Sequence, residues 1–211
     1  MAYSPLPTDL AQPKPATEHT QQAQARVRGE LNFADLQSFH DAQRGFIASI
    51  DPITIGRPDG HTFDLEQLYF LDGEAPDTVN PSLWRQAQLN AQHHGLYEVC
   101  DGLYQVRSFD IANMTLIRGE QGWIIIDPLT SSESSAAALA LANEQLGERP
   151  VVAVLITHSH ADHFGGILGV VSHQQVLSGE VPIIAPMDFV DESLNENVLA
   201  GNAMGRRATY M

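Results

Sequence analysis

The 211-residue sequence contains one cysteine and no long apolar run. A single cysteine excludes an intrachain disulfide, and the apolar neighbours of Cys100 predict a buried, unreactive thiol. The longest apolar runs, residues 123–126 and 151–156, have the length of a β-strand and are far too short to span a bilayer. The sequence therefore predicts neither a disulfide-stapled fold nor a transmembrane protein.

Basic residues are also scarce, because 11 Lys and Arg stand against 26 Asp and Glu, which gives a formal net charge of −15. Such a surface repels phosphate backbones, so the sequence predicts no nucleic-acid partner. It also repels small anions at long range, so an anion-binding site would need strong local positive charge. A bound divalent metal ion would supply that charge.

The N-terminal segment, residues 1–30, is rich in Pro, Gln, Thr and Ala. It lacks the basic and apolar regions of a signal peptide. We expect residues 1–30 to form a mobile arm. Residues 31–211 are enough for one globular domain or for part of a larger one.

From Gly95 onward the apolar pattern becomes strand-like. Short strands are expected at residues 96–99, 103–106 and 114–117. The continuous apolar runs at 123–126 and 151–156 predict two strands buried on both faces, with an alanine-rich helix at 131–146 between them. Gly119–Gly122 has the composition of a hairpin turn. This order predicts an α/β layered fold with its site at the carboxyl ends of the buried strands.

Three histidines and one aspartate follow directly after the second buried strand: His158, His160, Asp162 and His163. The first two histidines are two residues apart at a strand end, so both imidazoles can face one cation. Asp162 and His163 are adjacent in the sequence and can face a second cation close to the first. Mixed nitrogen and carboxylate ligands suit zinc first, then iron or manganese. The alternative is a polar loop that caps the next helix, but chance rarely places such a cluster at a strand end.

Asp127 ends the first buried strand, just before Pro128. A carboxylate at this place can hydrogen-bond the metal loop and hold a ligating histidine in one tautomer. The alternative is an ordinary turn aspartate before a proline. We expect Asp127 to support the metal ligands rather than to bind metal itself.

The segment Thr157–His163 matches the His-x-His-x-Asp-His signature of the metallo-β-lactamase superfamily, and Asp127 matches an aspartate that the superfamily carries at an earlier strand end. Three flanking segments resemble the bacterial alkyl sulfatases of the SDS-hydrolase type: Asp41–Ala48, Val79–Gln86 and Glu196–Arg207. The resemblance runs from about Leu31 to the end of the chain. It implies a metallo-β-lactamase-type αββα sandwich, of which residues 31–211 form only the N-terminal part.

The resemblance implies a binuclear zinc enzyme that hydrolyses long-chain alkyl sulfates to an alcohol and inorganic sulfate. His158 and His160 would bind one zinc, and Asp162 and His163 the other, with Asp162 also counted as catalytic. Water activated by the metal ions would replace a serine or cysteine nucleophile. Relatives are typically secreted or periplasmic homodimers. The resemblance thus implies that location, although this chain has no signal peptide, and a homodimer for the full-length protein.

The sequence ends at Met211, before two glutamates and a histidine that complete the family's ligand set, and before its dimerisation and C-terminal domains. Each zinc would keep two protein ligands here, whereas a catalytic zinc normally has three and a water. We therefore expect this chain alone to bind metal weakly and to have little or no activity.

Asn202 and Arg206 are the candidates for binding the sulfate group, together with Arg207, because an arginine fork matches oxyanions. The alternative for the arginines is a pair of surface salt bridges. The late carboxylates Asp188, Glu192 and Glu196 are expected on a solvated helix face rather than as replacement ligands.

Three other functions stay open. Another hydrolase of the same superfamily, such as a thioesterase or lactonase, fits the metal motif but not the flanking segments. A non-catalytic metal-binding module fits the two-ligand count. An iron-dependent oxidoreductase fits the scaffold.

Overall fold

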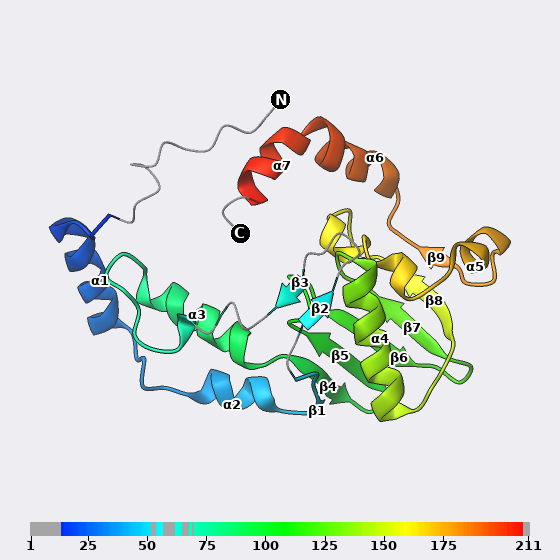
Figure 1. Cartoon of the computed structure of the whole chain (residues 1–211), viewed down its shortest axis with the longest axis horizontal. Helices are drawn as coiled ribbons and strands as arrows, with labels where there is room; N and C mark the ends of the chain where they lie inside the picture. The colour runs from blue at the N-terminus through cyan, green and yellow to red at the C-terminus, as the bar shows by residue number, and fades with distance from the viewer. Residues whose placement is uncertain (1–13, 52–53, 57–61, 65–67, 69, 209–211) are drawn as a thin grey trace.

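A computed structural model describes residues 14–51, 54–56, 62–64, 68 and 70–208 (Figure 1). The helices are α1 (Glu18–Glu30), α2 (Gln37–Gln43), α3 (Pro81–Gln92), α4 (Ser132–Leu146), α5 (His173–Ser178), α6 (Phe189–Leu194) and α7 (Gly201–Ala208), with short turns η2 (Ala161–His163), η3 (Ile167–Gly169) and the π-helical η4 (Asn195–Leu199). The strands are β1 (Phe46–Ala48), β2 (Thr54–Gly56), β3 (Thr62–Asp64), β4 (Gly95–Cys100), β5 (Leu103–Arg107), β6 (Met114–Arg118), β7 (Trp123–Ile126), β8 (Val151–Leu155) and β9 (Ile183–Ile184).

Seven strands form one mixed sheet in the order β1-β4-β5-β6-β7-β8-β9, while β2 and β3 form a separate hairpin. The pairs from β1 to β7 are antiparallel, and β8 and β9 run parallel to β7. A parallel pair needs a crossover, which α4 provides between β7 and β8. The carboxyl ends of β7 and β8 therefore meet at one edge of the sheet. This is the α/β arrangement that the sequence predicts.

The core lies between the sheet and α4. Alternate strand residues point into it and are fully buried, as are residues on the inner side of α4: Val106, Leu116, Ile125, Val154, Ala138 and Ala142. The indole Nε1 of Trp123 donates to Oδ1 of Asn143 at 2.8 Å and ties β7 to the helix. Ile124 and Ile126 point to the other face and are only half-buried. The expectation that β7 is buried on both faces is therefore correct for one face only.

The segment expected to be a mobile arm contains helix α1. The hydroxyl of Thr17 caps it by accepting the N–H of Thr20 at 3.2 Å. Near its end, Arg28 donates to the carbonyl oxygen of Ala75 at 3.1 Å and lies 3.9 Å from the Asp77 carboxylate. This part of the arm thus has regular structure and contacts the segment before α3; residues 1–13 lie outside the described residues.

Cys100 is exposed, so the expectation of a buried thiol is wrong. The register between β4 and β5 shifts between Glu98 and Cys100. Such an irregularity breaks the regular alternation of inward and outward side chains, so apolar neighbours in the sequence do not bury Cys100. All three residues from Glu98 to Cys100 are consequently exposed.

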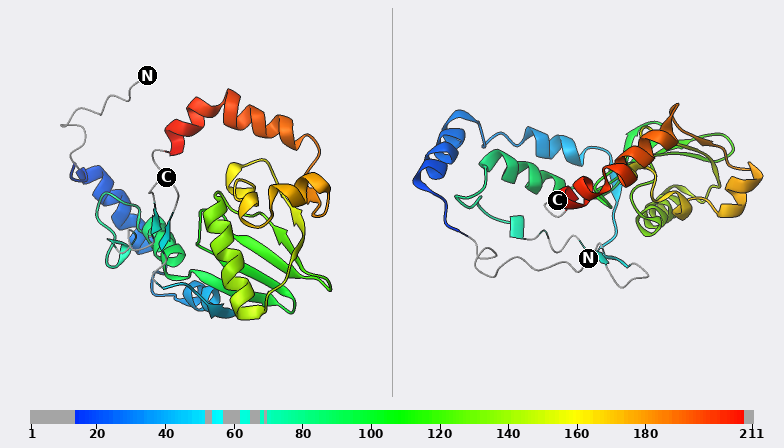
Figure 2. Two further views of the ribbon diagram at one scale, coloured as in Figure 1. Left: turned by 45° about the vertical axis from the view of Figure 1, so that its right-hand side comes forward. Right: turned by 90° about the horizontal axis from the view of Figure 1, so that it is seen from above.

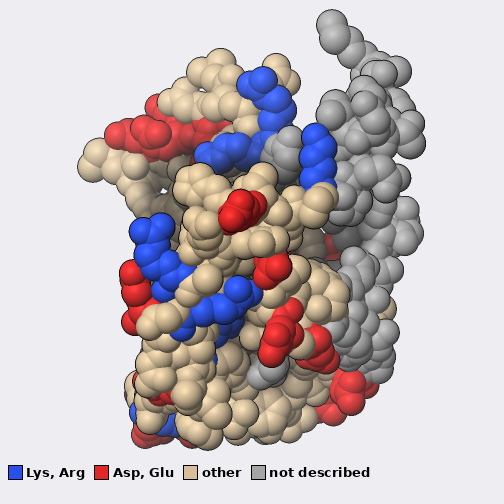
Figure 3. All heavy atoms as spheres, turned by 90° about the vertical axis from the view of Figure 1, so that its left-hand side faces the viewer, with Lys and Arg blue, Asp and Glu red and all other residues tan. Residues whose placement is uncertain are grey.

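Among the helices of the described ranges, none combines the length and the apolar character needed to cross a membrane. The face on the left of Figure 1 is shown with its charges in Figure 3, where Lys and Arg occur in separate groups between acidic side chains. That view has no continuous basic surface, in agreement with the net charge.

After β9 the chain leaves the sheet as an arc made of α6, η4 and α7, which turns back over the loop that follows β8 (Figures 1 and 2). We call residues 189–208 the arc. It carries several exposed apolar side chains: Val190, Leu194, Val198 and Leu199. Its inner side forms part of the site described next.

Candidate metal centre

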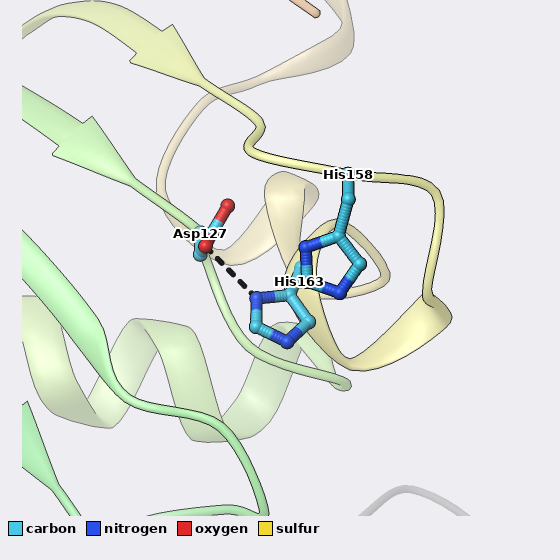
Figure 4. Close-up of side chains that lie close together, drawn as sticks. All are labelled: Asp127, His158 and His163. Carbon is cyan, nitrogen blue, oxygen red and sulfur yellow. Dashed lines mark hydrogen bonds and ion pairs between the residues drawn. The ribbon is translucent and has the colours of Figure 1, made fainter. Parts of the chain in front are cut away.

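The two segments that carry the predicted ligands meet at the carboxyl ends of β7 and β8. Asp127 follows β7, and residues 157–163, the metal loop, follow β8. The backbone N–H of Asp127 donates to the carbonyl oxygen of Leu155 at 3.0 Å, which joins the two strand ends. Figure 4 shows Asp127, His158 and His163 converging from these two segments.

Asp127 is a buried carboxylate, 7% exposed, that accepts hydrogen bonds from the metal loop. The N–H of Thr157 donates to Oδ1 at 2.8 Å, and its hydroxyl donates to Oδ2 at 2.6 Å. Nδ1 of His163 lies 2.8 Å from Oδ2, the contact dashed in Figure 4. The backbone of Asp127 has φ 55°, a left-handed conformation that aspartate tolerates better than most residues. The metal loop is therefore fixed to the end of β7 by one side chain.

These contacts set the tautomers of two histidines. The single hydroxyl proton of Thr157 goes to Asp127, so Thr157 Oγ1 can only accept from Nδ1 of His158, 2.9 Å away. Likewise His163 must donate from Nδ1, because the carboxylate of Asp127 has no proton to give. In both rings the lone pair is then on Nε2, where a metal ion can bind it.

His160 is oriented from the other direction. Its Nε2 lies 3.2 Å from Oε1 of Glu196 in η4, and a carboxylate at this place favours the proton on Nε2. Nδ1 of His160 then carries the lone pair, and it lies 2.9 Å from Nε2 of His158. Two facing lone pairs repel each other, and a cation that both nitrogens bind removes that repulsion.

The ligand atoms thus fall into two pairs. Nε2 of His158 and Nδ1 of His160 are 2.9 Å apart, and Oδ2 of Asp162 and Nε2 of His163 are 3.3 Å apart. Two ligand atoms on one tetrahedral zinc, each about 2.0 to 2.1 Å from the ion, are separated by roughly 3.3 Å. The donors present therefore fit zinc in chemistry and in spacing. These pairs join the residues that the sequence assigns to each ion, and their role as zinc ligands stays a prediction.

Asp127, His158 and His163 also form a group whose potential ligand atoms lie within 4.8 Å of one another. By distance alone Asp127 could be a ligand. Its oxygens, however, already accept from Thr157 twice and from His163 once. Asp127 is thus already engaged by the metal loop, and its role in supporting the ligands rather than binding metal stays a prediction.

Glycines pack the segment after the metal loop against the start of α4. The N–H of Gly166 donates to the carbonyl oxygen of Leu129 at 2.8 Å, and the buried hydroxyl of Ser135 donates to the carbonyl oxygen of Gly166. A Cβ at Gly169 would collide with the backbone oxygen of Ser132. Only glycine lets this segment approach α4 so closely.

A cavity of about 510 Å³ lies between the metal loop and the arc. The loop contributes His160 and Asp162 to its lining, and the arc contributes Glu196, Asn197 and Arg207. Its remaining lining includes Ile111, Thr130, Ala161, Gly201, Met204 and Gly205. Asn202 and Arg206, the residues proposed from sequence for sulfate binding, are exposed and are not part of this lining.

Glu196 is the residue that sequence reasoning missed. It was expected on a solvated face, yet its side chain is 21% exposed and contacts His160, which is 55% exposed. The contact joins residues 36 positions apart, so no local pattern predicts it. The one sequence feature that pointed to Glu196 is that it begins the segment resembling alkyl sulfatases.

Comparison with known proteins identifies relatives. The family model of the metallo-beta-lactamase superfamily matches residues 107–207. A linear primary-alkylsulfatase from Pseudomonas sp. is 48% identical over 202 residues, which cover 94% of this chain and 30% of the relative. An alkyl/aryl-sulfatase from Saccharomyces cerevisiae is 48% identical over 193 residues, 90% of this chain and 30% of its own length.

A solved structure agrees with these relatives. The stereoselective inverting sec-alkylsulfatase Pisa1 from Pseudomonas sp. superposes with a TM-score of 0.84 at 46% identity, over 93% of this chain and 31% of that one. The chain thus spans about a third of the length of the proteins it matches. Residues 107–207 thus match the metallo-β-lactamase superfamily, and over about a third of their length the alkylsulfatases are homologous to this chain.

Proposed function

We propose that this protein hydrolyses alkyl sulfate esters, of the SDS type, to an alcohol and inorganic sulfate at a centre of two zinc ions. The observation that carries the proposal is the arrangement of four potential ligand side chains after β8 in two close pairs, beside a cavity that is lined by Arg207. The names of the relatives agree with this substrate class. By the same resemblance we propose a periplasmic or secreted location and a homodimer for a chain of the relatives' full length.

In this proposal His158 and His160 hold one zinc, while Asp162 and His163 hold the other. When bound, zinc supplies an activated water and positive charge that offsets the sulfate oxygens. Asp127 keeps Nε2 of His163 free by holding the proton on Nδ1. Because each ion has two ligands among these residues, we expect weak metal binding and little turnover by this chain alone.

The cavity suggests how the substrate binds. Arg207 lines it on the arc, and its guanidinium fork suits a sulfate group. Ile111 and Met204 in the same lining offer apolar contact to an alkyl chain. We therefore propose Arg207 in place of Arg206 as the arginine that binds the sulfate.

A pair of adjacent arginine variants tests this assignment. Arg207→Ala is expected to weaken binding of decyl sulfate to the zinc-loaded chain by about 10-fold, since a charge-assisted contact to the sulfate is lost. Arg206→Ala, which makes the same change in net charge, is expected to leave the affinity unchanged. Isothermal titration calorimetry measures both.

Equal losses in the two variants would assign the effect to general charge rather than to Arg207. If decyl sulfate bound no better with zinc than without it, the substrate class would be wrong. A decanoyl thioester bound in its place would instead favour another hydrolase of the superfamily.

A further inference from the structure

Resting on the proposed metal centre, we infer that Glu196 is a positioning residue: it holds His160 with Nδ1 toward the metal and thereby anchors the arc to the metal loop. Its carboxylate lies 3.2 Å from Nε2 of His160 and is mostly shielded from water, although the arc around it is exposed. The neighbouring acidic residues of the arc, Asp191 and Glu192, are exposed.

The chain contains a parallel for this role. Asp127 contacts the outer nitrogen of His163, and Glu196 contacts the outer nitrogen of His160. Each proposed metal pair therefore includes one histidine with a carboxylate behind it. A carboxylate in that place fixes the tautomer and the ring orientation and makes the ligand nitrogen more basic. The two rings differ in the nitrogen that is left free, Nε2 in His163 and Nδ1 in His160.

Local backbone geometry brings Glu196 to this position. It lies in η4, a π-helical turn between α6 and α7. Single π-turns are uncommon within helices and recur at functional sites. Here the turn lies where the arc passes the metal loop, and both segments line the same cavity.

The contact couples metal binding to the cavity. Asn197, Met204 and Arg207 of the arc form one wall, while His160 and Asp162 form the opposite one. A zinc ion bound to Nδ1 of His160 holds the ring in place. Because Glu196 of the arc contacts the other nitrogen of that ring, zinc binding also orders the arc. By linkage, a substrate that orders the arc raises zinc affinity by the same factor.

Zinc titration of three variants tests the inference. Glu196→Ala is expected to weaken zinc binding by about 10- to 100-fold. Glu196→Gln, which keeps an acceptor oxygen without the charge, is expected to lie between Glu196→Ala and the wild type. Glu192→Ala removes the same charge one helical turn earlier on an exposed site and is expected to match the wild type. Circular dichroism verifies that all variants keep the fold.

Hydrogen exchange gives a second readout that does not depend on turnover. Zinc is expected to slow amide exchange in α7 of the wild type and of Glu192→Ala, but not of Glu196→Ala. The inference would be overturned if Glu196→Ala had the same zinc affinity as Glu192→Ala and the same slowing of amide exchange in α7 by zinc.

The two proposals can fail separately. Zinc affinity that depends on Glu196, without binding of decyl sulfate, would support the positioning role and contradict the substrate class. Zinc-dependent binding of decyl sulfate through Arg207, with no effect of Glu196→Ala, would contradict the positioning role alone.

Discussion

Asp127→Asn is expected to weaken zinc binding by about 10- to 100-fold and to destabilise the fold by about 2 kcal/mol. Asparagine keeps the shape of the side chain and tolerates the left-handed backbone at φ 55°, so the change isolates the carboxylate. In the variant one of the two carboxylate oxygens is replaced by an NH₂ group, which cannot accept from the donors of Thr157 and His163. Either a donor of Thr157 loses its acceptor, or His163 changes tautomer and places its proton on Nε2. Both outcomes remove support from the ligands.

Asp110→Asn is the matched control. Asp110 accepts from the N–H and the hydroxyl of Thr130 on the neighbouring loop, without contact to a proposed ligand. Its replacement is expected to lower stability in urea unfolding but to leave zinc affinity unchanged. Zinc affinity equal in Asp127→Asn and Asp110→Asn would show that Asp127 has only a structural role.

Gly169→Ala is expected to destabilise the protein by about 3 kcal/mol. A Cβ at this position would collide with the carbonyl oxygen of Ser132 and the hydroxyl of Ser135 at the start of α4. The first of these is a backbone atom in a helix and cannot move aside alone. The segment after the metal loop would have to separate from α4, which also displaces the ligands.

Gly29→Ala in α1 is the control, because a Cβ there has no neighbour within 4 Å. In a helix that change is expected to stabilise by about 0.5 to 1 kcal/mol. Chemical unfolding followed by circular dichroism measures both variants. A Gly169→Ala variant as stable as the wild type would mean that the segment does not pack against α4 in solution.

The sequence predicts the parts of the molecule that depend on local pattern. The apolar runs of β7 and β8 and the alanine-rich α4 appear within one residue of their expected limits. From these elements follows the meeting of Asp127 with the metal loop, because a parallel strand pair has its carboxyl ends together. The predicted position of the site is thus a consequence of chain order and strand direction.

Features that depend on irregular strand pairing or on contacts between distant segments do not follow from the sequence pattern. The exposure of Cys100 follows from an irregularity in strand pairing. The contact of Glu196 with His160 depends on the path of the arc after β9. The same path decides which of two adjacent arginines faces the cavity, since neighbouring residues on a helix point about 100° apart.

The most direct test of the metal centre is native mass spectrometry of the chain titrated with zinc. We expect the wild type to bind two zinc ions, His158→Ala to lose one of them, and His163→Ala to lose the other. A spectrum in which the wild type binds no more zinc than a variant lacking both histidines would contradict the assignment of the loop after β8 as a metal centre.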